Sequence, residues 1–237
     1  VRGGQVAVTV HSRSRWLRFA GYDEFEFTDG RRYEGYRAES MQAQNMFTED
    51  HLTLDDKGNA ALSIAVGPND IAYDADLLVN ASVTAPSNEV IAKTFTLPYF
   101  HARTYFGIKT PGYFAEVQKP QTIQIVAVTP DGKPASGPAK LTITRRDWNC
   151  VWEDWGYRGN YQCKENTQTL LTKTLQLTSD KPAEIPFTPD TGGDYWIVVE
   201  GDNAKQGAAT AAAEFYSWGD GGGSWRSSDS MTIEMVA

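Results

Sequence analysis

The sequence has few cysteines and histidines and no long apolar run. It contains two cysteines and three histidines in 237 residues. No stretch reaches the roughly 18 consecutive apolar residues that a membrane-spanning helix requires. The histidines (His11, His51 and His101) are scattered, and none has ligand-like spacing to a cysteine. We therefore expect no metal site and no membrane contact by this segment.

Basic residues are also scarce. The chain has 22 Lys and Arg against 30 Asp and Glu, which gives a net charge of -8. No basic run is longer than the pairs Arg31-Arg32 and Arg145-Arg146. Proteins that bind nucleic acids usually cluster basic residues on one face. The composition therefore predicts no nucleic-acid partner.

The sequence lacks the motifs of common enzyme classes. No G-x-S-x-G elbow, P-loop, dinucleotide fingerprint or H-E-x-x-H motif is present. Carboxylates such as Asp23 and Glu26 are numerous, but in an acidic protein they are expected on the solvated surface. We therefore predict no catalytic residue, no cofactor and no enzymatic activity.

Short alternating runs of apolar residues occur throughout the chain. Examples are residues 6–10, 62–66, 122–128 and 195–199, with turn signals rich in Asp, Gly and Pro between them. Alternation at a period of two predicts half-buried strands. The fold class is therefore predicted to be all-β, with residues 34–50 as the best place for an irregular or helical turn.

An internal repeat predicts two domains. A turn at residues 56–59 precedes a strand at 77–83, and a turn at 180–182 precedes a strand at 195–199. Two copies of one unit would explain this order. We predict two tandem antiparallel β-sandwich domains, residues 1–101 and residues 102–237.

The two copies differ in completeness. Before its repeated part the second copy has strand patterns at residues 105–109, 122–128 and 141–144, whereas the first copy has one, at residues 5–10. The first domain is therefore expected to lack its N-terminal strands. The chain is expected to start inside a domain.

The two cysteines, Cys150 and Cys163, flank one local aromatic-rich loop. A local pair of this kind is typical of a disulfide, which would place the protein in the periplasm or otherwise outside the cytoplasm. A reduced pair and two ligands of a metal site are the alternatives. Structural zinc sites usually need four ligands, which argues against the metal.

Five aromatic residues surround the cysteines: Trp148, Trp152, Trp155, Tyr157 and Tyr161. If they are exposed, their rings could stack on sugars and form a carbohydrate-binding surface. If they are buried, they form a packing cluster in which each indole N–H finds a partner. We favour packing, and we retain these residues as a candidate interaction surface.

Two stretches resemble a known family. The residues Phe106-Gly107-Ile108-Lys109-Thr110, the run from Ala115 to Pro134 with its Asp131-Gly132-Lys133-Pro134 turn, and Leu141-Thr142-Ile143 resemble the opening of a macroglobulin domain. The run Asp190 to Val199 resembles the G-x-Y strand that closes such domains. The chain is similar to bacterial alpha-2-macroglobulin-like proteins over most of its second half, and more loosely over its first.

The resemblance implies a large periplasmic protease trap. In that family, cleavage of a bait segment triggers a conformational change that captures the protease. This chain would then be a structural part of the shell around the bait, with other domains of the parent chain and target proteases as partners. The family thioester motif is C-x-E-Q, whereas Cys163-Lys164-Glu165-Asn166 has Asn in place of Gln. No thioester is therefore expected here.

Two other functions stay open from the sequence. The first is an extracytoplasmic carbohydrate-binding or adhesion module that uses the aromatic cluster from Trp148 to Tyr161. The second is an accessory domain of a β-rich glycoside hydrolase.

Overall fold

The structure, a computed structural model, describes residues 2–28, 44–67, 70–71, 73–154, 159–201 and 209–219. These residues form twelve strands and no helix, so the predicted all-β fold class is confirmed. In chain order the strands are β1 (Gln5–Ser14), β2 (Gln44–Thr53), β3 (Ala75–Thr84), β4 (Val90–Tyr99), β5 (Tyr105–Lys109), β6 (Phe114–Glu116), β7 (Gln121–Val128), β8 (Gly137–Asp154), β9 (Gly159–Leu177), β10 (Ala183–Phe187), β11 (Gly193–Gly201) and β12 (Thr210–Trp218). Over the described ranges, no helix could span a membrane.

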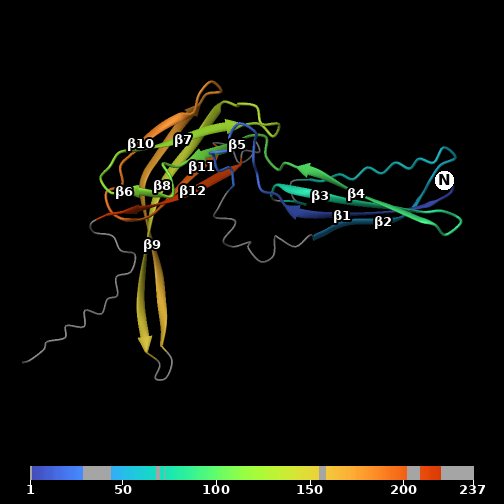
Figure 1. Cartoon of the computed structure of the whole chain (residues 1–237), viewed down its shortest axis with the longest axis horizontal. Coiled ribbons are helices and arrows are strands. Elements are labelled where there is room, and N and C mark those ends of the chain that lie inside the picture. The colour runs from blue at the N-terminus through green and yellow to red at the C-terminus, as the bar shows by residue number, and fades with distance from the viewer. Residues whose placement is uncertain are drawn as a thin grey trace, which may run out of the picture.

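The first unit is a four-stranded antiparallel sheet with the order β2-β1-β3-β4. Val6, Val8 and Val10 of β1 are buried, while the residues between them are only half-buried. This is the alternation that the sequence predicts for a strand with one apolar face. Figure 1 shows this sheet extending away from one end of the second unit.

The apolar face of the first sheet is uncovered at β4. Ile91, Phe95 and Leu97 lie opposite Val83, Val79 and Leu77 of β3, so they share the face that carries the β1 valines. They are nevertheless 62%, 45% and 53% exposed. The described residues of this unit build one sheet, whereas those of the second unit build two.

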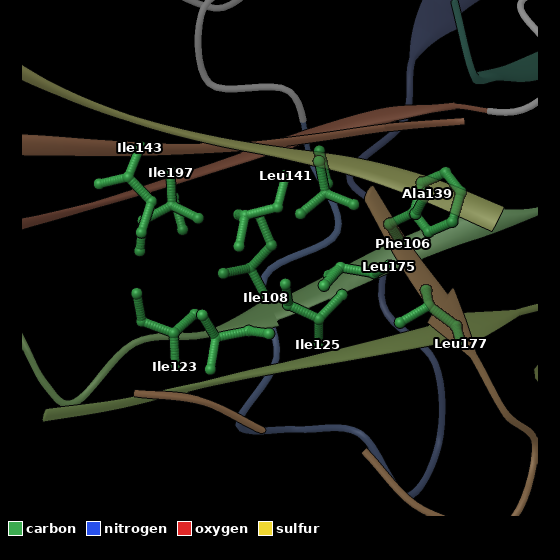
Figure 2. Packing of buried hydrophobic residues seen from close by; sticks show 14 of the residues in the cluster. Phe106, Ile108, Ile123, Ile125, Ala139, Leu141, Ile143, Leu175, Leu177 and Ile197 are labelled. Carbon is green, nitrogen blue, oxygen red and sulfur yellow. The ribbon is translucent and has the colours of Figure 1, made fainter. Parts of the chain in front are cut away.

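The second unit is a sandwich of a three-stranded sheet, β10-β7-β5, and a five-stranded sheet, β6-β12-β11-β8-β9. All its strand pairs are antiparallel except β6 with β12. Aliphatic side chains from both sheets meet between them, as Figure 2 shows. Its fully buried members include Ile108, Ile123, Ile125, Leu141, Ile143 and Ile197.

One expectation of local structure is wrong, and a second falls partly outside the described residues. Residues 62–66 form no strand, and Leu62 and Ile64 are each 37% exposed. Alternating apolar residues give a segment one apolar and one polar face, but a β-strand also needs a neighbouring strand to pair with. Of the stretch at 34–50, residues 44–50 belong to β2 and the remainder lies outside the described residues.

The segment 17–28 connects the two units. It follows β1 in the chain, yet Leu17, Phe19 and Phe27 are buried in one cluster with Tyr105 and Val126 of the second unit. The division into residues 1–101 and 102–237 stays a prediction.

Candidate interaction arm

Strands β8 and β9 are much longer than their neighbours, at 18 and 19 residues. Strand β11 pairs with β8 only as far as Arg146, which lies opposite Asp194. Strands β8 and β9 continue to pair as far as Asp154 and Gly159. We call the two-stranded part, residues 147–154 and 159–166, the arm. At about 3.3 Å per residue its eight residue pairs are roughly 26 Å long. Figure 1 shows the arm projecting away from the sandwich.

The part of β9 in the arm whose side chains are described is exposed to solvent. Every residue from Gln162 to Thr169 is exposed. An isolated two-stranded ribbon is at best marginally stable in water. The arm therefore needs stabilisation at its root, along its length, or from a partner.

Arg145 stabilises the root from one face of the sheet. Its Nε donates to Oδ2 of Asp147 at 3.1 Å, and its Nη2 donates to Oε1 of Gln168 on β9 at 3.2 Å. Its Nη1 also donates to the Thr191 hydroxyl. The Arg145 side chain is only 17% exposed, and its guanidinium joins β8 and β9 to the loop before β11.

Tyr195 extends this network into the core. Its side chain is fully buried, and its hydroxyl donates to the Thr191 carbonyl at 2.7 Å, with Oδ1 of Asp190 at 3.1 Å. Burial raises the pKa of the Tyr195 hydroxyl. Burial alone would also raise the pKa of Asp190, but the hydrogen bond from Tyr195 and the nearby Arg145 charge hold it below its ordinary value. The loop before β11 is thus fixed against the root.

Arg146 holds the opposite face. Its guanidinium carbon lies 3.6 Å from the centroid of the Trp196 ring, a cation–π contact, and its Nη1 lies 3.6 Å from Oε1 of Glu165 on β9. Trp196 is itself buried beside Val198 and Ala212. Because consecutive strand residues face opposite sides, the two arginines support the root on both faces.

The register brings most of the predicted site residues together. Three directly opposed pairs fall at alternating positions and therefore on one face of the arm. They are Trp148 with Glu165, Cys150 with Cys163, and Trp152 with Tyr161. We call this the cysteine face. The other two predicted residues, Trp155 and Tyr157, lie outside the described residues.

The two cysteines occupy directly opposed positions. Opposed residues of an antiparallel pair have Cα atoms about 4.5 to 5.5 Å apart, inside the range of about 4.4 to 6.8 Å that a disulfide spans. Neither strand would have to move for the predicted bond to form. No cysteine in the described part of the chain is free.

The residues that could suggest a thioester or a metal site form neither arrangement in the described part of the chain. Cys163 and Asn166, the ends of the thioester-like quartet, lie in the extended strand β9. Within the described ranges, no three metal-binding side chains come together.

A second exposed aromatic group lies at the β6 edge, and the sequence analysis missed it. Tyr113, Phe114 and Trp218 are 67%, 64% and 55% exposed. The Phe114 ring centroid lies 5.0 Å from that of Tyr113 and 6.3 Å from that of Tyr216. Consecutive residues of a strand point to opposite faces of the sheet, so two consecutive aromatic residues cannot both face the core of the sandwich. The Tyr113-Phe114 dipeptide could therefore have signalled this surface.

Comparison with known proteins agrees with this architecture. Residues 107–221 match the family described as bacterial macroglobulin domain 6. The chain is 21% identical over 238 residues to the alpha-2-macroglobulin homolog of Nostoc sp., which covers 99% of this chain and 12% of that protein.

Solved structures show the same fold at low sequence identity. Native Escherichia coli alpha-2-macroglobulin matches with a TM-score of 0.56 and 16% identity, over 92% of this chain and 14% of that one. The Salmonella alpha-2-macroglobulin mutant Y1175G matches with a TM-score of 0.58 and 16% identity, over 91% and 14%.

The second unit, which the family model matches, is a macroglobulin-type β-sandwich. The chain is similar to bacterial alpha-2-macroglobulins, so the resemblance inferred from the sequence is confirmed. It spans 12% of the length of its curated relative.

Proposed function

We propose that this chain is a non-catalytic structural segment of a periplasmic protease trap of the alpha-2-macroglobulin type. The match of its sandwich to bacterial macroglobulin domain 6 carries the proposal. The absence of the common catalytic motifs from the sequence supports a structural role. Its partners would be the other domains of the parent chain and, through the parent, the target protease.

The arm is the part of this segment that we assign to contacts with those partners. It projects into solvent, and its root is fixed on both faces by Arg145 and Arg146. A rigid root presents a surface in one orientation and lowers the entropic cost of binding. Trp148 and Trp152 occupy alternating register positions of the cysteine face, and tryptophan is enriched among the residues that dominate interface energetics.

We also propose a disulfide between Cys150 and Cys163. Their direct opposition in the register supports it. A disulfide in the arm would agree with a periplasmic location, because such bonds persist in oxidising compartments.

Removal of the arm tests the proposed function. Arg146 and Thr167 are directly opposed, so a two-residue Asn-Gly turn can replace residues 147–166 and close the hairpin in register. We expect the chain shortened in this way to remain folded. We expect the parent protein with the same deletion to lose protease capture, measured as protection of a large protein substrate.

Substitutions on the two faces of the arm provide the matched comparison. Trp148→Ser on the cysteine face should weaken capture, whereas Asn149→Ser on the other face should not. Full capture by the shortened parent would contradict the role of the arm. Failure of the unaltered parent to capture any protease would contradict the trap itself. Glycan binding that disappears with Trp152→Ala and Trp155→Ala would favour the carbohydrate-binding alternative.

A further inference from the structure

The two units are joined by more than a covalent connection. The segment 17–28, which we call the linker segment, follows β1 of the first unit but forms backbone hydrogen bonds with the second. Glu26 N–H donates to the Ile108 carbonyl at 2.8 Å, and Ile108 N–H donates back to Glu26 at 2.9 Å. Ala212 N–H of β12 donates to the Thr28 carbonyl at 3.2 Å. The linker segment thus contacts both sheets of the sandwich.

Phe27 fits the linker segment closely against β5. Its side chain is 2% exposed, and its ring lies directly over Gly107. A Cβ atom at Gly107 would lie 2.7 Å from Cζ of Phe27, closer than real Cβ contacts allow. Glycine at this position is therefore required for the ring to pack here.

Aromatic rings from both units continue this packing. The Phe19 and Phe27 centroids are 4.7 Å apart, and Phe19 lies 5.7 Å from Tyr105 of β5. Phe100, which follows β4, lies 6.0 Å from the same Tyr105 ring. Rings at such distances pack favourably in tilted or edge-to-face arrangements. Tyr105 is fully buried between parts of the chain that come from both units.

A polar contact fixes the orientation of these groups. The Tyr105 hydroxyl donates to the carboxylate of Asp74, the residue directly before β3. The same carboxylate accepts the His101 N–H at 3.0 Å, and the Ala102 N–H donates to the Tyr105 hydroxyl at 3.0 Å. The Asp74 carbonyl accepts the Arg15 N–H at 2.8 Å. Each hydrogen bond has a defined direction, so the contact resists rotation as well as separation.

Arg15 adds a further contact at the end of β1. Its Nη1 lies 2.6 Å from Oδ1 of Asp76 on β3, and its guanidinium lies 5.6 Å from the Phe100 ring centroid. The two passages between the units that lie in described residues, after β1 and after β4, are therefore held.

We infer that the two units form one rigid body, held by the linker segment and by the contact between Tyr105 and Asp74. A hinge needs a few residues that can change their backbone angles freely. Here the two crossings that the structure describes, after β1 and after β4, carry buried rings and directed hydrogen bonds instead. If a longer protein that contains this chain rearranges, its hinge then lies outside the two units. A displacement of the first sheet therefore moves the arm as well. This inference does not depend on the protease-trap function.

The distance between the units tests the inference. Spin labels attached through non-canonical amino acids at Thr96 on β4 and Lys173 on β9, both exposed, leave the cysteines untouched. Pulsed electron paramagnetic resonance should give one narrow distance distribution for the unaltered chain. Tyr105→Phe and, separately, Gly107→Ala should broaden it, the second by displacing Phe27.

Tyr113→Phe is the matched control, because it removes a hydroxyl from a tyrosine that is 67% exposed and whose ring packs against Phe114 of β6 and not against the linker segment. It should leave the distribution unchanged. Amide hydrogen exchange at Glu26 and Ile108 should accelerate in the Gly107→Ala chain and stay slow in the control. A broad distribution in the unaltered chain, or no change in either variant, would overturn the inference.

Discussion

The proposed bond between Cys150 and Cys163 gives a quantitative prediction for the arm. The bond would close a loop of about 15 residues, for which chain entropy gives about 3 kcal/mol of stabilisation against opening. Because the arm has no third strand, this energy acts on local opening of the ribbon. Every 1.4 kcal/mol changes an equilibrium constant tenfold. Loss of the bond should therefore raise the population of the locally opened ribbon about a hundredfold.

Amide hydrogen exchange measured by mass spectrometry resolves this effect by region. In the Cys150→Ser, Cys163→Ser double variant, exchange should accelerate by about two orders of magnitude across the arm. Peptides from the sandwich core that contain Ile143 or Ile197, both fully buried, should keep their rates. Thermal unfolding of the sandwich should also be unchanged, because the root depends on Arg145 and not on the bond.

Two controls separate the bond from other effects of the substitutions. Reduction of the unaltered chain should reproduce the exchange pattern of the double variant. Lys164→Ala, next to Cys163 on the opposite face of the arm, should not. Equal exchange in the oxidised and reduced chains would refute the stabilisation argument. Two free thiols in titration of the unfolded, unreduced protein would refute the bond itself.

Three further predictions concern the sandwich, the root and the pH dependence. Ile197→Ala should cost about 2 to 5 kcal/mol in urea unfolding, whereas Phe95→Ala, on the exposed part of β4, should cost under about 1 kcal/mol. Arg145→Lys keeps the positive charge but loses the planar set of guanidinium donors. Amide hydrogen exchange should therefore accelerate at Gln168 and at the root of the arm. Burial and the nearby Glu214 raise the pKa of Glu26, so the folded state holds this proton more tightly. The free energy of unfolding then falls as pH rises from the ordinary Glu pKa through the raised pKa of the folded state. Glu26→Gln should therefore raise the urea midpoint at pH 7, and this gain should vanish in acid.

Local chemistry made much of the sandwich predictable. The Asp131-Gly132-Lys133-Pro134 turn was expected from its residues, and Gly132 adopts a positive φ of 77° while its N–H donates to the Thr129 carbonyl at 2.8 Å. The apolar run at 195–199 is buried between neighbours on both sides, as a central strand should be. In each case the information lies within a few residues of the chain.

Features that depend on distant partners were not predictable. Residues 62–66 have a strand pattern but no strand to pair with, and residues 17–28 pack against β5, about 80 positions further along the chain. The great length of β8 and β9 was also missed. Beyond Arg146 the strands pair only with each other, and the described β9 residues from Gln162 to Thr169 are all exposed, so this part of β9 lacks the apolar alternation that marks a strand with one buried face.

The candidate site was predictable in composition but not in arrangement. Cysteine count and local spacing predicted the pairing of positions 150 and 163, and the register agrees with it. Arg145 and Arg146 were considered only as a short basic run that argued against nucleic-acid binding. Their roles at the root depend on Thr191 and Trp196, which lie about 50 residues away in the chain.

The stabilising contacts of the arm are divided between two places, and this division has a mechanical consequence. Arg145 and Arg146 fix the direction in which the arm leaves the sandwich, whereas the cysteine pair lies four residue pairs beyond Arg146. Loss of the proposed bond would therefore loosen the outer ribbon without redirecting its base. Because the linker segment also fixes the first sheet against the sandwich, the base of the arm and the exposed face of β4 keep a constant separation. A partner that contacts both surfaces would meet a preformed arrangement, which lowers the entropic cost of binding.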